Sequence, residues 1–84
     1  MTDLKRLYQS ELPNRAIVVY LYLRGRANRD GVCWPAVPTM ARELRVSEST
    51  IRRALRELVR EGFLVIEKRK RASGADSSNR YRLS

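Results

Sequence analysis

Apolar positions along residues 47–62, SESTIRRALRELVREG, repeat at the spacing of an α-helix that buries one face. At about 100° per residue, one side of this helix collects apolar residues and the opposite side collects polar ones. The apolar side consists of Ile51, Ala54, Leu55 and Leu58. The polar side consists of Ser49, Arg52, Arg53, Arg56 and Arg60. Ser47 suits the N-cap and Gly62 suits the left-handed position after the last turn, so the pattern predicts a capped amphipathic helix over residues 48–61.

Two further helical patterns precede this segment. Residues 13–26 begin with a proline that suits a first helical turn, and they are apolar on nearly every side. Such a helix is covered on more than one face, either by the N-terminal arm or by a second copy of the chain. Val18 and Tyr22 point away from its main apolar stripe. Residues 37–44 predict a short helix whose buried positions are Met40, Ala41 and Leu44.

The connection between the last two helices is only three residues long, over 45–47. Two short helices joined this closely, the second with a polar outer face, form a helix-turn-helix. Val46 in this connection is expected to point inward and seal the joint between the helices. The small side chain of Ala41 is expected to let the two helices approach closely.

After Gly62 the apolar period changes from 3.6 residues to 2, which predicts strands. Residues 63–66 read Phe-Leu-Val-Ile, and residues 80–83 alternate so that Tyr81 and Leu83 face inward. The loop over 72–79 is rich in Gly, Ser and Asp, so the two strands are expected to form a hairpin. Residues 32–34 predict a very short strand in which Trp34 plugs the core.

The first twelve residues, MTDLKRLYQSEL, allow two interpretations. The residues near helical spacing are Leu4, Leu7, Tyr8 and Leu12, but a helix this short is stable only when it docks on the body of the protein. The alternative is a loosely held arm. The chain is therefore divided into an N-terminal arm at 1–12 and a domain at 13–84, and the fold class is α+β and mainly α.

The charge of the chain is strongly basic, with 18 lysines and arginines against 9 acidic residues and a net charge of +9. Residues 1–44 hold 7 basic and 4 acidic side chains, whereas residues 45–84 hold 11 and 5. The excess is therefore concentrated in the half that contains the 48–61 helix. A basic chain of this kind is expected to bind a polyanion, either nucleic acid or an anionic membrane.

Catalytic and metal-binding chemistry finds no support in the residue types present. The chain has no histidine and a single cysteine, Cys33, so it lacks the pairs used by nucleophilic enzymes and the usual zinc ligands. Neither a leader peptide nor an apolar run long enough to span a bilayer is visible, since the longest covers residues 16–23. We expect a cytoplasmic protein that is not an enzyme, needs no cofactor and does not bind membranes.

The phrase PTMARELRVSESTIRRALRELVREGFLVIEKR, followed by NRYRL, resembles a bacterial winged helix-turn-helix DNA-binding domain. Similar domains stand at the N-terminus of GntR-type regulators and in phage and plasmid replication-initiation proteins. The resemblance implies a three-helix core with a C-terminal β-hairpin wing, in which the third helix enters the major groove. It further implies that Ser47, Ser49 and Thr50 lie at the start of the recognition helix and that Arg52, Arg53 and Arg56 face the groove. GntR-type regulators add a large effector-binding domain, so these 84 residues are expected to be either a free-standing DNA binder or one domain of a longer protein.

Physical reasoning also favours sequence-specific binding of double-stranded DNA. Arginine can form bidentate hydrogen bonds with guanine in the major groove, and Arg52 and Arg53 are the first candidates for base contacts. A basic wing over 68–82 is expected to contact the flanking backbone, because phosphate contacts position more than they specify. The candidate phosphate contacts are Arg42, Arg45, Lys68, Arg69, Lys70 and Arg71. The expected role is transcription regulation, or replication or excision of a mobile element.

Each of these expectations has an alternative. Glu48 precedes Arg52 by four residues and could hold it in a surface ion pair, and Glu57 could hold Arg53 and Arg60 away from DNA. The basic run of the wing could serve only to prevent strand-to-strand aggregation. The domain could also be a protein-interaction module, or a homodimer, that uses the N-terminal arm and the apolar face of the first long helix.

Overall fold

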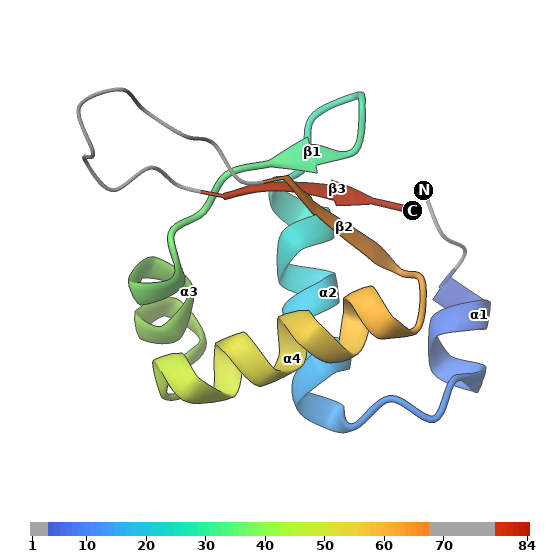
Figure 1. Cartoon of the computed structure of the whole chain (residues 1–84), viewed down its shortest axis with the longest axis horizontal. Helices are drawn as coiled ribbons and strands as arrows, with labels where there is room; N and C mark the ends of the chain where they lie inside the picture. The colour runs from blue at the N-terminus through green and yellow to red at the C-terminus, as the bar shows by residue number, and fades with distance from the viewer. Residues whose placement is uncertain (1–3, 68–78) are drawn as a thin grey trace.

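The computed structural model describes residues 4–67 and 79–84, which form a mainly helical body with a small antiparallel sheet. The elements follow one another along the chain as α1 (Leu4–Gln9), α2 (Asn14–Arg26), β1 (Val32–Cys33), α3 (Val37–Leu44), α4 (Glu48–Arg60), β2 (Leu64–Glu67) and β3 (Arg80–Leu83) (Figure 1). The helices α2, α3 and α4 with the β2–β3 hairpin are the winged helix-turn-helix architecture that the sequence predicts.

The core lies between α2, α4 and the inner face of the sheet. Helix α4 crosses α2, while α3 and α1 lie toward opposite ends of the body (Figure 1). The ring of Tyr20 on α2 meets the ring of Phe63 edge-on, with centroids 5.8 Å apart. The apolar face predicted for α4 is buried as expected, over Ile51, Ala54, Leu55 and Leu58.

Helix α4 is capped at both ends as the sequence predicts. The Ser47 hydroxyl accepts a hydrogen bond from the Thr50 backbone N–H at 3.0 Å. At the other end Gly62 has φ +80°, and the N–H of Phe63 donates to the carbonyl of Leu58 at 2.9 Å. These bonds satisfy backbone groups that a helix end would otherwise leave free, so both ends of α4 are fixed.

The sheet has three strands in the order β1-β3-β2, so β3 is central and pairs antiparallel with both neighbours. Tyr81 and Leu83 of β3 are buried, as their alternation predicts. The pairing of Val32 with Arg82 and of Cys33 with Tyr81 was not predicted. A strand of two residues is too short to show the period-2 alternation by which a partner is found.

The N-terminal segment takes the first of its two interpretations, a docked helix. Leu7 of α1 is fully buried, and Leu12 joins it in the core. The Arg6 guanidinium lies 5.0 Å from the centroid of the Phe63 ring, which adds a cation–π contact to the apolar burial. Tyr8, which lies at the same helical spacing, is exposed.

Two side chains expected in the core lie at the surface. Trp34 is 43% exposed, because Cys33 takes the core-facing position and side chains alternate along an extended chain, which turns the next residue to the other face. Val46 is 38% exposed, because backbone bonds close the turn: its N–H donates to the carbonyl of Ala41 at 3.0 Å. The joint between α3 and α4 is therefore sealed without the Val46 side chain.

The Tyr20 hydroxyl is buried and has no hydrogen-bond partner within residues 4–67 and 79–84. A buried unsatisfied polar group costs on the order of 1–3 kcal/mol, so we expect Tyr20→Phe to raise the free energy of unfolding by about 1 kcal/mol. Urea denaturation measures this change. Tyr81→Phe is the matched control, because the Tyr81 hydroxyl bonds to the Asn79 side chain and its removal should destabilise. Destabilisation by both substitutions would show that the Tyr20 hydroxyl is satisfied.

Candidate nucleic-acid interface

The exposed face of α4 carries a row of arginines opposite the core. Positions 49, 53, 56 and 60 fall opposite Ile51 and Leu58 at 100° per residue, and all four are exposed. Arg52 lies on the flank of this face, beside Val59. The face is therefore formed by Ser49, Arg53, Arg56 and Arg60, with Arg52 at its edge.

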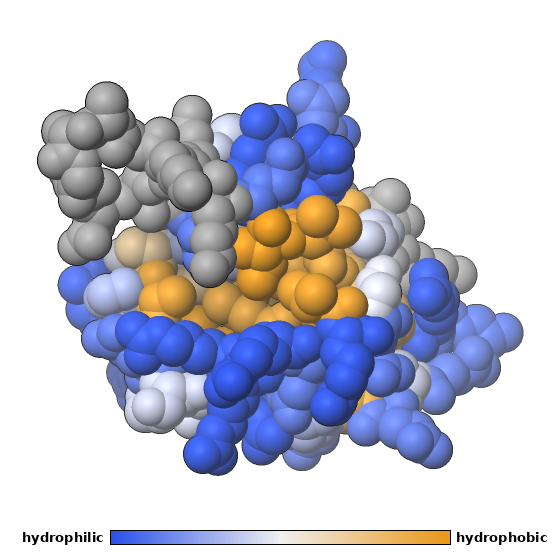
Figure 2. Space-filling view, viewed as in Figure 1, coloured by the Kyte–Doolittle hydropathy of each residue, from blue (hydrophilic) through white to orange (hydrophobic). Residues whose placement is uncertain are grey.

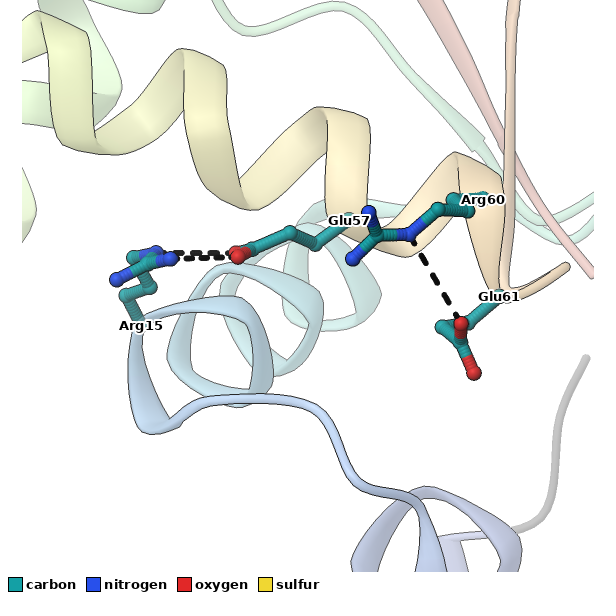
Figure 3. A network of polar contacts seen from close by, with 4 residues as sticks. All are labelled: Arg15, Glu57, Arg60 and Glu61. Atoms are coloured by element: carbon teal, nitrogen blue, oxygen red, sulfur yellow. Dashed lines mark hydrogen bonds and ion pairs between the residues drawn. The ribbon is translucent and has the colours of Figure 1, made fainter.

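The acidic side chains of α4 are each engaged by a particular arginine. Glu48 pairs with Arg52 at 3.1 Å, the surface pair that the sequence allowed as an alternative. Glu61 lies 4.0 Å from Arg60 (Figure 3). The carboxylate of Glu57 points toward Arg15 of α2, where Nε donates to Oε1 at 3.0 Å and Nη2 donates to Oε2 at 2.5 Å (Figure 3).

The Arg15–Glu57 pair decides one of the alternatives. Glu57 could have held Arg53 and Arg60, but both of its oxygens accept hydrogen bonds from Arg15, a residue 42 positions away. The hydrogen bonds to Glu57 raise the pKa of the Arg15 guanidinium above its ordinary value, and the negative charge of Glu57 adds to this. The pair joins α2 to α4 beside the arginine row.

The same arrangement places a fourth arginine beside the row. A hollow of about 420 Å³ is lined by Arg15, Arg53, Arg56, Glu57 and Arg60. Sequence reasoning missed Arg15, since nothing in the local pattern of α2 distinguishes it from a solvated surface residue. Only the crossing of α2 and α4 brings it to this face.

The other predicted contact residues are distributed around this face. The hydroxyls of Ser47 and Thr50 lie 2.8 Å apart at the start of α4 and take part in its cap. Arg42 is exposed on the last turn of α3, and Arg45 is exposed in the turn before α4. In the wing, Arg80 and Arg82 lie near Glu67, at 3.9 and 3.0 Å. Four candidates, Lys68, Arg69, Lys70 and Arg71, lie outside the described residues.

Other chemistry finds no site in the described parts of the chain. The Cys33 thiol is buried, lies 3.6 Å from the carbonyl of Leu23, and has its pKa raised by that burial, which disfavours the nucleophilic thiolate. Within residues 4–67 and 79–84, no cluster of acidic, histidine or cysteine side chains could hold a metal ion. Helices in the same residues are all too short or too polar to cross a bilayer.

The family of the domain that carries this arginine row follows from its similarity to known proteins. Residues 10–64 match the model of a family described as a helix-turn-helix domain. The chain belongs to this family. The match runs from the residues before α2 to the start of β2, and so includes the whole of α3, the turn and α4. The arginine row therefore lies on the second helix of a DNA-binding helix-turn-helix domain.

The helix-turn-helix domain is also similar to Protein YmfN of Escherichia coli (strain K12), with 33% identity over 60 residues. These residues make up 71% of this chain and 13% of the relative, so the chain spans only a small part of that protein's length. No solved structure matches the chain.

The apolar surface of α2 bears on the dimer expectation. Val18 is 45% exposed and Leu21 is also exposed, whereas Tyr22 is half-buried and donates a hydrogen bond to Glu43 of α3. Val18 and Val46 together line a hollow of about 210 Å³. The helix-turn-helix domain thus exposes apolar side chains on α2 that a second copy could cover. The homodimer through this face stays a prediction.

The turn of the helix-turn-helix domain holds a strained residue. Arg45 has φ 59° and ψ 44°, the left-handed conformation that costs a non-glycine residue on the order of 1–2 kcal/mol. We expect Arg45→Gly to raise the free energy of unfolding by about 1 kcal/mol in thermal or urea denaturation, and to weaken DNA binding if Arg45 contacts a phosphate. Arg45→Ala, which removes the charge but keeps a Cβ on the left-handed backbone, separates the two effects. Equal or lower stability of the glycine variant would mean that other contacts offset the strain.

Proposed function

We propose that the domain binds double-stranded DNA in a sequence-specific manner, with α4 in the major groove and the β2–β3 hairpin on the flanking backbone. The observation that carries this proposal is the arginine row of α4. Of the carboxylates beside it, Glu57 pairs with Arg15 of α2 and Glu48 pairs with Arg52 at the edge of the row, so the charges of Arg53 and Arg56 have no carboxylate partner among the described ion pairs.

The dimensions of α4 support groove binding. A helix of 13 residues is about 20 Å long, and the major groove of B-DNA is about 12 Å wide and admits a helix. Arg53 and Arg56 are the primary candidates for base contacts, because they lie opposite the core and none of the described ion pairs includes them. A bidentate contact from arginine to guanine contributes on the order of 1–3 kcal/mol of discrimination.

Arg52 is proposed to contact DNA only after it leaves its ion pair with Glu48. Its pair with Glu48 is exposed at both ends, and such pairs contribute little to stability, so the guanidinium can exchange Glu48 for a phosphate or a base. Ser49 and Thr50 at the start of α4 can bond to bases or phosphates, and Ser47 lies next to them. The free backbone N–H groups at the helix start favour a phosphate.

The remaining basic residues are proposed to contact phosphates. Arg42 and Arg45 flank the turn on one side of α4, and Arg60 lies at its far end. Wing residues Lys68, Arg69, Lys70 and Arg71 extend the basic surface along the sequence. Phosphate contacts of this kind fix the position of the protein on the duplex without reading its sequence.

The biological role that we propose is regulatory: control of transcription, or of replication or excision of a mobile element, in a bacterial cytoplasm. A helix-turn-helix domain with a basic wing suits each of these tasks, because each requires a protein to find one site among many. The division into a segment at 1–12 and a DNA-binding domain at 13–84 belongs to the same proposal.

The proposal is tested by fluorescence anisotropy with labelled duplexes across a salt series, after selection of tight binders from a random library. If five or six of the proposed residues reach phosphates at the same time, the log–log slope is about −4.5 to −5.4. The selected duplex should bind at least about 10³-fold more tightly than random duplex at physiological salt. A selected pool that binds no better than random DNA would reject sequence-specific binding, and a flat salt dependence would reject the basic face as the DNA surface.

A further inference from the structure

A second surface lies beside the arginine row, between the C-terminal half of α4 and β2. It is a groove of about 650 Å³ whose lining includes Val59 of α4 and Leu64, Val65 and Ile66 of β2, together with Arg56 and Arg60. Figure 2 shows a broad apolar area on this side of the molecule, bordered below by a band of hydrophilic side chains. The groove thus combines apolar side chains with positive charge.

Two valines in this groove are exposed although they are apolar. Val59 is 43% exposed and Val65 is 48% exposed, and they face the same hollow from different elements. Single exposed apolar residues are common on protein surfaces, but a contiguous set in a concave site marks a binding surface. The volume falls within the range of ligand-binding clefts, which is about 300–1,000 Å³.

Among the described residues, the groove also lies beside the edge strand of the sheet. In the order β1-β3-β2, strand β2 is at the edge of the sheet. The N–H of Ser84 donates to the carbonyl of Phe63 at 3.1 Å, which makes this a hydrogen-bonded pair. Because such pairs alternate along an antiparallel ladder, the backbone N–H and C=O groups of Leu64 and Ile66 point away from β3. They are oriented to pair with another strand.

We propose that this groove binds an extended peptide that carries apolar and acidic side chains, and that the peptide adds to β2 as a fourth strand. Strand addition would satisfy the outward backbone groups of Leu64 and Ile66. Apolar side chains of the peptide would cover Val59 and Val65, and its carboxylates would meet Arg56 and Arg60. The partner is therefore an acidic protein segment in extended conformation.

Charge distinguishes this partner from a second copy of the chain. Pairing β2 with β2 of another molecule would bring two sets of Arg56 and Arg60 together, on proteins that each carry a net charge of +9. Like charges across an interface are unfavourable, and an acidic peptide has the complementary sign. This proposal does not depend on DNA binding. Because Arg56 and Arg60 also line the hollow on the arginine row, DNA and the peptide should compete for the chain.

The test uses a labelled eight-residue peptide with four central valines and two glutamates at each end, titrated into the full chain by fluorescence anisotropy. We expect saturable binding that Val65→Glu weakens at least fivefold. Val18→Glu is the matched control, because Val18 is similarly exposed but lies outside the groove, and it should leave binding unchanged. The amide signals of Leu64 and Ile66 in ¹⁵N NMR spectra should shift on addition of the peptide.

Two control peptides separate strand addition from simple attraction to a basic protein. A version with serines in place of the valines keeps the charge, and a version with N-methylated central residues cannot donate backbone hydrogen bonds. Both should lose binding. The proposal is overturned by binding that survives either change, by equal effects of Val65→Glu and Val18→Glu, or by an absence of binding at millimolar peptide. Self-association of the chain that Val65→Glu abolishes would assign the groove to a second copy and would also overturn it.

Discussion

Arg53→Ala/Arg56→Ala is expected to bind the selected duplex roughly 60-fold more weakly than the unmodified chain at 0.1 M salt. This figure is a lower limit that counts only the charge of each arginine as one phosphate contact: with a slope of about −0.9 per contact, each contributes a factor of about 8 at this salt concentration, and the two contribute the product. The loss grows if either arginine bonds to a base, since a base contact adds its own discrimination. Fluorescence anisotropy across a salt series measures both the affinity and the change in slope.

The control for this variant removes the same charge elsewhere. Arg26→Ala/Arg29→Ala changes residues at and beyond the end of α2, next to the turn that precedes β1, while α4 lies on another side of the body (Figure 1). It should reduce affinity only a few-fold. Equal losses in the two double variants would mean that overall charge attracts the DNA and that the arginine row has no special role. Circular dichroism would confirm that both variants keep their helices.

Tyr81→Ala is expected to lower the free energy of unfolding by about 3–5 kcal/mol, because truncation of a buried aromatic residue leaves a cavity. Tyr81 is almost completely buried and lies on the central strand, paired with Cys33 on one side and Ile66 on the other. A domain of 84 residues has a total stability of roughly 4–13 kcal/mol, so this one change removes a large part of it. Urea denaturation followed by circular dichroism measures the loss.

The matched control for Tyr81 is Val65→Ala, an exposed position on the neighbouring strand. It should change stability by no more than about 0.5 kcal/mol. A loss below about 1 kcal/mol for Tyr81→Ala would contradict the structure, because it would place the ring outside the core. A variant that is already unfolded in water would support the prediction at its upper limit.

Much of the fold could be predicted because its signals are local. The caps of α4 at Ser47 and Gly62 are set by the residues at those positions, and helix 37–44 has the same bounds in the structure as in the prediction. The inward positions of Tyr81 and Leu83 follow from alternation within one strand. In each case the residues that determine the feature lie within one turn or one strand of each other.

The features that escaped prediction depend on contacts between distant segments. The inward position expected for Val46 was wrong because backbone bonds closed the turn, and Trp34 was excluded from the core by its neighbours in β1. The pairing of β1 with β3 joins residues about 50 positions apart. In the candidate site, the arginines of α4 were visible in the sequence, but Arg15 joined them only through the crossing of α2 and α4.

The central position of β3 has a consequence for how the chain reaches its fold during synthesis. Strands β1 and β2 both pair with β3, and they do not neighbour each other in the sheet. The ribosome completes all the helices before it delivers residues 80–83, so the helices can associate while β1 and β2 still lack their common partner. Until then the apolar side chains of Phe63 and Leu64 are covered incompletely. Closure of the sheet, and of the wing with it, therefore waits for the last strand to leave the exit tunnel.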